Sequence, residues 1–125
     1  MSMRTPLGKV RGLGSAKEGT EHFWRQRLTA VANIPLVIIG LWLVISLVGA
    51  PYGEVRATLA SPLVAIFIAL FSISVLYHMR LGMQVVIEDY VSGEGAKIVL
   101  LVLNTLFCIA LGAIAVMSII VIAGN

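Results

Sequence analysis

The sequence predicts an all-α membrane protein with three transmembrane helices. Of its 125 residues, 59% are hydrophobic and only 12% are charged, so the chain lacks the polar side chains that cover a soluble domain. Three stretches contain no Asp, Glu, Lys or Arg: 28–53, 57–79 and 98–125. Each is longer than the ~20 residues that a helix needs to cross a bilayer. Spanning strands would instead show segments of about ten residues with alternating polarity.

The distribution of basic residues predicts the orientation of the spans. Six of the nine Lys and Arg residues precede residue 28, the segment 50–60 contains only Arg56, and no basic residue follows Lys97. Basic residues near membrane spans stay on the cytoplasmic side. We therefore expect a multi-pass protein of the bacterial cytoplasmic (inner) membrane, with the N-terminus cytoplasmic and the C-terminus periplasmic. The basic residues are dispersed and close to the membrane, which argues against nucleic-acid binding.

The first segment, 1–27, is predicted to be a cytoplasmic tail that ends in an interfacial stretch. Glycines and Pro6 disfavour a helix over residues 1–19. Phe23 and Trp24 are typical of the membrane interface. The first 17 residues are basic and free of acidic residues, which faintly resembles an organellar transit peptide, but they are few for that role and a retained bacterial tail is expected. The apolar run that follows is too long for the h-region of a cleaved signal peptide.

The three spans follow in order along the chain. Pro35 falls inside the first span and is expected to kink it or to mark its early turns. Ser61 and Pro62 are residue types of an N-cap and a first helical position, so they predict the start of the second span. The predicted segments are a helix over 28–50, a periplasmic loop over 51–60, a helix over 61–86, a cytoplasmic loop over 87–97 and a helix over 98–122.

His78 is the outstanding candidate for chemistry, because ionisable residues inside a membrane span are costly and commonly functional. Ser74 and Gly82 lie four residues to either side, so on a helix the three share one face. A flat macrocycle needs such clearance for a histidine nitrogen to reach its iron, and haem is commonly held by histidine. The alternative is a neutral histidine hydrogen-bonded across a helix interface, which spacing alone favours. Arg80 points elsewhere and is expected to extend toward the headgroups.

Asp89 and Tyr90 close the second apolar run. Asp89 follows His78 by 11 residues, three helical turns or about 16 Å along one stripe. A phenol donates a hydrogen bond to a quinone carbonyl, and a neighbouring carboxylate orients it or supplies protons. An interfacial tyrosine beside a solvated acidic helix end is the alternative, and these two residues alone favour it. The lone Cys108 has no metal-ligand spacing around it and is expected to pack as a small buried side chain.

Two motifs resemble one known family. The stretch HMRLGMQVVIEDYV, which begins at His78, resembles the His-x3-Gly-Met…Asp-Tyr-Val signature of a small membrane anchor. This anchor belongs to succinate dehydrogenase (succinate:quinone oxidoreductase, complex II) of the haem b-containing bacterial type. The upstream stretch GTEHFWRQRLTA is similar to that family's glycine followed eight residues later by Arg-x-Thr-Ala. Both motifs stand where the family has them, one before the first span and one at the end of the second.

The resemblance implies roles for individual residues. His78 would be the axial ligand of haem b, with Ser74 and Gly82 on the haem face and a second histidine from the larger membrane anchor, the cytochrome b subunit. Tyr90 would bond a ubiquinone carbonyl, with Asp89 at the quinone site or its proton path. Arg27 would lie near the haem propionates, which suits an arginine at the membrane interface. His22 is shifted by one position from a histidine in some relatives and is expected to be an interfacial residue.

The resemblance also implies the function and the partners. The chain would anchor succinate dehydrogenase and complete the haem and ubiquinone sites, linking the tricarboxylic acid cycle to electron transport. FAD and iron–sulfur clusters would reside only on the flavoprotein and iron–sulfur subunits, so the chain alone would not oxidise succinate. The alternatives are a fumarate reductase anchor, a small transporter or channel without haem, and a purely structural anchor.

Overall fold

The computed structural model describes residues 5–12 and 17–124. Within these residues there are five helices: α1 (Pro6–Val10), α2 (Lys17–Ser46), α3 (Tyr52–Ala60), α4 (Pro62–Tyr90) and α5 (Glu94–Gly124). Three of them include stretches long and apolar enough to cross a membrane, namely Thr20–Ser46, Pro62–Tyr90 and Glu94–Gly124. The all-α class and the three spans are therefore confirmed, while the side of the membrane on which each end lies stays a prediction.

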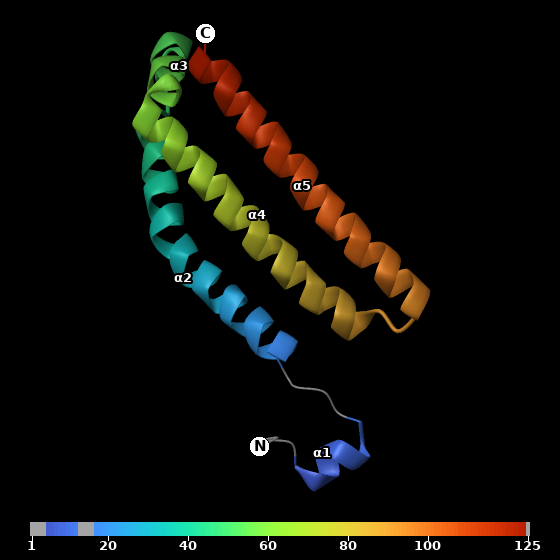
Figure 1. Cartoon of the computed structure of the whole chain (residues 1–125). Helices are drawn as coiled ribbons and strands as arrows, with labels where there is room; N and C mark the ends of the chain where they lie inside the picture. The colour runs from blue at the N-terminus through green and yellow to red at the C-terminus, as the bar shows by residue number, and fades with distance from the viewer. Residues whose placement is uncertain (1–4, 13–16, 125) are drawn as a thin grey trace.

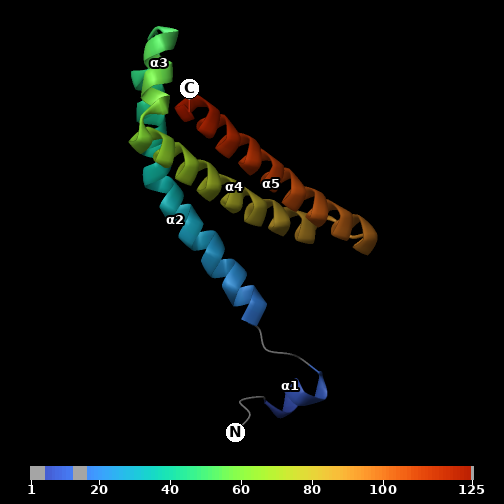
Figure 2. The same ribbon diagram turned by 45° about the horizontal axis from the view of Figure 1, so that its top comes forward.

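Helix α4 is the centre of the fold (Figure 1). It packs against both α2 and α5, whereas α2 and α5 make no close backbone approach within the described residues. The three long helices run side by side, and the short α3 sits at the end near the C-terminus in both views (Figures 1 and 2). The only buried apolar side chains among the described residues are Ala65, Leu81, Ile87 and Cys108. So small a core cannot stabilise a soluble protein, and the exposed apolar side chains must meet lipid or other subunits.

Two glycines face neighbouring helices at ordinary van der Waals contact distance. A Cβ placed on Gly40 of α2 would lie 3.4 Å from the Phe71 ring of α4, and one on Gly112 of α5 would lie 3.6 Å from Leu76 Cδ1. Small residues of this kind bring membrane helices close together, where van der Waals packing is the main attraction. Pro35 lies inside α2, whose axis changes direction between its two halves (Figures 1 and 2). A missing N–H and the clash of the proline ring with the preceding turn account for such a bend.

The predicted boundaries needed correction because helices extend beyond the apolar runs. Residues 6–10 form α1 instead of an extended chain, with Pro6 at its start. The predicted loop 51–60 contains α3, which follows Pro51 and the turn at Gly49 with its φ of +80°. Helix α4 continues through Tyr90, so the predicted loop 87–97 is reduced to residues 91–93. The hydrogen-bonded helix continues past the apolar run into the membrane–water interface, because no glycine or proline ends it there.

The start of α4 is where the sequence placed it. Ser61 is the N-cap and Pro62 the first helical residue, with Ala65 N donating to Ser61 O at 2.9 Å. The Ser61 hydroxyl, however, makes no capping bond and donates to Thr58 O at 2.9 Å. This bond ties the end of α3 to the start of α4.

Candidate functional site

The stripe that contains His78 faces α2. Its three members each meet a polar residue of that helix: Ser74 Oγ donates to Asn33 Oδ1 at 2.6 Å, His78 Nδ1 lies 2.9 Å from Thr29 Oγ1, and a Cβ on Gly82 would lie 3.5 Å from Gln26 Nε2. Ser74, His78 and Gly82 therefore all face α2. Their expected place on the face of a macrocycle stays a prediction.

The hydrogen bonds of Thr29 are compatible with one tautomer of His78. The Thr29 hydroxyl has a single hydrogen and lies 2.8 Å from Arg25 O and 3.1 Å from Gln26 O. When that hydrogen is donated within α2, the hydroxyl can accept from a hydrogen on His78 Nδ1, 2.9 Å away. In this tautomer the lone pair of the ring is on Nε2.

The Nε2 atom of His78 is open at the surface of the chain. The buried side-chain nitrogen and oxygen atoms without a hydrogen-bond partner, within the described residues, are His22 Nε2 and Gln26 Oε1. His78 is half-buried and its Nε2 is not among them, nor does it bond another described residue. No three His, Cys, Asp or Glu side chains of the described segments come together as a metal site.

Asp89 and Tyr90 lie on the last turn of α4 and are exposed, Tyr90 at 84%. In the described part of the chain no hydrogen bond or ion pair connects their side chains to other helices. At 1.5 Å per residue they are about 16 to 18 Å from His78 along the axis of α4. The structure therefore brings the three residues onto one helix but not into one cavity.

Arg27 lies at the same end of the bundle as Asp89 and Tyr90. Its guanidinium carbon is 4.7 Å from the centroid of the Phe23 ring, a cation–π contact, and the side chain is exposed. Closer to the N-terminus, Arg25 pairs with Glu21 at 3.5 Å on the surface. Arg27 thus remains available to a group outside this chain.

The sequence did not predict the hydrogen-bond partners of His78 and Arg80. Thr29 was not singled out, although α2 carries the polar stripe His22, Gln26, Thr29 and Asn33 at helical spacing, which is a readable signal. Arg80 does more than extend toward the headgroups, because its Nε donates to Thr105 Oγ1 on α5 at 3.2 Å. Asn104 Nδ2 also donates to Arg80 O at 3.0 Å. Cys108 is buried, as predicted.

Comparison with known proteins identifies the class. The profile of the family described as succinate dehydrogenase/fumarate reductase transmembrane subunit matches residues 1–121. The chain belongs to this family, so it is a multi-pass membrane anchor subunit, consistent with the bacterial inner membrane, and it works with partner subunits.

Similar proteins include succinate dehydrogenase hydrophobic membrane anchor subunits from Rickettsia bellii and Paracoccus denitrificans. The first is 37% identical over 85% of this chain and 85% of the relative. The second is 33% identical over 90% of this chain and 86% of the relative. A succinate dehydrogenase membrane anchor subunit from Reclinomonas americana is 32% identical over 82% and 83% of the two chains. No solved structure matches the chain.

Proposed function

We propose that this chain anchors a succinate dehydrogenase, supplies one axial ligand of haem b through His78, and forms part of the ubiquinone-reduction site. The observation that supports the haem assignment most directly is the Thr29–His78 contact, 2.9 Å long, which leaves Nε2 free to face a ligand when Nδ1 carries the hydrogen. Histidines that bind metals characteristically donate their other ring N–H to an oxygen acceptor. The donor set thus suits a haem iron.

The chain's own residues would hold the haem as follows. Thr29 fixes the ring of His78, and Arg27 lies at the end of the bundle as a cation for a propionate. Haem iron in membranes commonly takes two histidine ligands, and His78 is the only histidine in the second or third span. The family resemblance assigns the second ligand to the other membrane anchor, the cytochrome b subunit. When bound, the haem provides a one-electron redox centre beside α4.

The quinone half of the proposal rests on Tyr90 and Asp89. The phenol donates a hydrogen bond to a ubiquinone carbonyl, and the carboxylate orients it or passes protons, because reduction to quinol consumes two protons and two electrons. Both side chains are exposed and without partners in the described chain, so the iron–sulfur and cytochrome b subunits complete the pocket. Electrons from succinate arrive through FAD and iron–sulfur clusters on the partner subunits.

The haem assignment is tested by a reduced-minus-oxidised spectrum of the purified native complex. In His78→Ala the b-type band should fall several-fold, and added imidazole should restore part of it by filling the vacated position. The set of subunits that copurify with the variant controls for assembly. A b-type band of unchanged size and shape in an assembled variant would exclude His78 as a ligand. It would favour a packed structural histidine or a channel instead.

The quinone assignment is tested by Tyr90→Phe, which removes one hydroxyl from an exposed site. Quinone reduction should fall about tenfold, the usual loss for one charge-assisted or well-oriented hydrogen bond. Succinate oxidation with an artificial acceptor should be unchanged, because the flavin lies on another subunit. Equal loss of both activities would indicate a defect of assembly and contradict the assignment. The same site would serve a fumarate reductase anchor, and measuring both directions separates the two.

A further inference from the structure

A groove runs along the side of α4 that carries Arg80, apart from the His78 stripe. It follows Ile73, Tyr77, Arg80 and Gln84, which share one helical face at spacings of four, three and four residues. Arg80 is about 200° around the helix from His78 at 100° per residue, so the groove and the histidine use different sides of α4. The haem ligand and this groove are therefore separate features.

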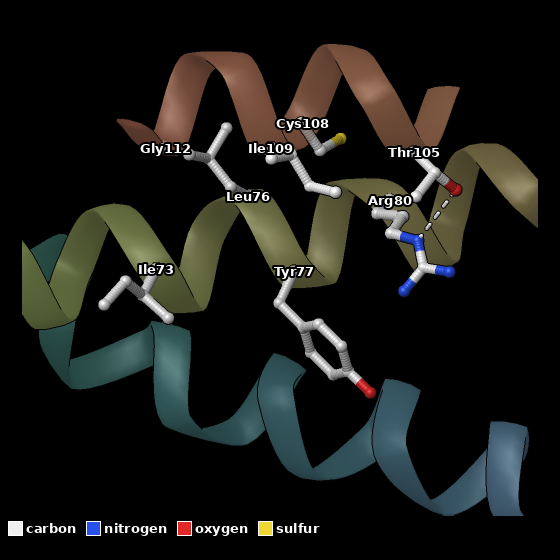
Figure 3. A pocket seen from close by; sticks show the side chains of 8 residues that line it. All are labelled: Ile73, Leu76, Tyr77, Arg80, Thr105, Cys108, Ile109 and Gly112. Atoms are coloured by element: carbon white, nitrogen blue, oxygen red, sulfur yellow. Dashed lines mark hydrogen bonds between the residues drawn. The ribbon is translucent and has the colours of Figure 1, made fainter. Parts of the chain in front are cut away.

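The groove consists of two neighbouring cavities that differ in chemistry. The first, about 230 Å³, is lined by Ile73, Leu76, Thr105, Cys108, Ile109 and Gly112. The second, about 270 Å³, is lined by Glu21, His22, Arg25, Leu81 and Gln84. Tyr77 and Arg80 line both cavities, and Figure 3 shows them beside the apolar one. The groove is thus apolar toward the middle of the membrane and polar toward the end of α4.

The polar cavity has an excess of positive charge. It contains Arg25 and Arg80 against Glu21, two positive charges and one negative, which leaves one positive charge in excess. Arg25 pairs with Glu21 at 3.5 Å, while Arg80 makes no ion pair within the described residues. Arg80 Nε is used by Thr105, and the two terminal nitrogens point away from α5 (Figure 3). A half-buried arginine in a membrane span calls for an anionic partner.

Two further donors converge on the polar cavity. The Tyr77 side chain extends from α4 toward α2 (Figure 3). His22, which lines the cavity from α2, has a buried Nε2 without a hydrogen-bond partner in the described part of the chain. A buried polar atom left unpaired implies a bound water or ligand. Guanidinium, phenol and imidazole together can all donate to a group that carries several acceptor oxygens.

We propose that this groove binds one anionic phospholipid, with its phosphodiester against Arg80 and Tyr77 and one acyl chain along Ile73, Leu76 and Ile109. Phosphate oxygens accept paired hydrogen bonds from a guanidinium. Arg80 is ten residues from the end of α4, about 15 Å, and a long side chain reaches from there toward the headgroup level. A neutral quinone would leave the excess charge uncompensated, and a partner's carboxylate would leave the apolar cavity unfilled.

The test uses native mass spectrometry of the purified complex, with phosphatidylglycerol as the probe and phosphatidylcholine as its comparison. The unmodified complex should retain one phosphatidylglycerol per copy of this chain, about tenfold more than phosphatidylcholine. Arg80→Gln should abolish the preference. Arg11→Gln removes the same charge from an exposed position outside the groove and should keep it. Gly112→Leu leaves the charge intact but fills the apolar cavity, and it should lower retention as well.

Several results would overturn the proposal. Equal retention by the unmodified complex and Arg80→Gln would do so, as would equal losses in Arg80→Gln and Arg11→Gln. If inorganic phosphate stabilised the complex as much as phosphatidylglycerol does, the site would bind a soluble anion and not a lipid. Absence of retained lipid, together with loss of the second membrane anchor in Arg80→Gln, would identify a partner's carboxylate instead. Should Arg80→Gln fail to assemble, unchanged retention in both Gly112→Leu and Tyr77→Phe would refute the site.

Discussion

The interfaces of α4 with α2 and with α5 each contain a threonine that contacts a polar side chain of α4. On α2, Thr29 donates to Arg25 O four residues earlier, and its Oγ1 lies 2.9 Å from His78 Nδ1. On α5, Thr105 donates to Leu101 O four residues earlier, at 3.0 Å, and accepts from Arg80 Nε at 3.2 Å. In each case a threonine satisfies its own hydrogen within its helix and presents a lone pair to α4.

The two interfaces differ in the side chain of α4 that each threonine contacts. On the α2 side it is an imidazole, whose far nitrogen can offer a lone pair to a metal. On the α5 side it is a guanidinium, which has no lone pair to offer and keeps its remaining donors for an anion. Two residues of one helix thus acquire opposite chemistry, one as a ligand atom and one as a fixed cation. We therefore expect mutations at the α2 interface to affect haem binding and mutations at the α5 interface to affect mainly thermal stability.

The largest effect is expected for Thr29→Val in the native complex. Valine has nearly the shape of threonine but no lone pair, so His78 Nδ1–H loses its acceptor. Loss of such an outer partner commonly costs 10- to 100-fold in the affinity of a metal site. Haem content should therefore fall on washing, and the b-type spectrum of the remaining haem should shift. The measurement is haem per complex together with the reduced-minus-oxidised spectrum.

Thr29→Ser is the matched control, because serine restores the oxygen without the methyl group. It should recover most of the haem retained by the unmodified complex. Normal haem affinity and an unshifted spectrum in Thr29→Val would show that the threonine does not orient His78. A failure that serine does not rescue would point to packing of the methyl group instead.

The sequence predicted the three membrane spans and the start of α4. The charge-free runs predicted three spans because a bilayer tolerates little else, and Ser61-Pro62 marked the start of α4 correctly. The helix ends were predicted incorrectly, because an apolar run indicates which residues lie in the bilayer and not where the backbone hydrogen bonds of the helix end. Hence α4 reaches Tyr90 and α3 occupies a predicted loop.

The pairing across helices was not legible, for a different physical reason. Spacing placed His78 between Ser74 and Gly82 on one face, but which helix lies against that face depends on tertiary packing. The partners Thr29 and Thr105 are 49 and 25 residues from the groups they accept from. The stripe that contains Thr29 marks a polar face of α2, but the sequence does not say which helix this face meets. Only the packed structure shows which lone pairs face α4.

A smaller effect is expected for Thr105→Val, which removes the acceptor from Arg80 Nε. Hydrogen bonds between membrane helices average about 0.6 kcal/mol and reach roughly 1.7 kcal/mol. The complex should therefore melt a few degrees lower, while its b-type spectrum stays that of the unmodified protein. Thermal unfolding and the optical spectrum are measured on the same sample. A spectral shift as large as that of Thr29→Val would erase the distinction between the two interfaces.

The smallest effect is expected for Ser74→Ala, which tests whether the α2 interface depends on His78 alone. The change removes the 2.6 Å bond to Asn33 but leaves the Thr29–His78 bond in place. At about 0.6 kcal/mol for such a bond, melting should fall by roughly one or two degrees, with haem content unchanged. Ser118→Ala is the control, since its hydroxyl bonds Ile114 O within α5 and should shift melting less. Loss of haem in Ser74→Ala would mean that Asn33 and Ser74 position the histidine together with Thr29.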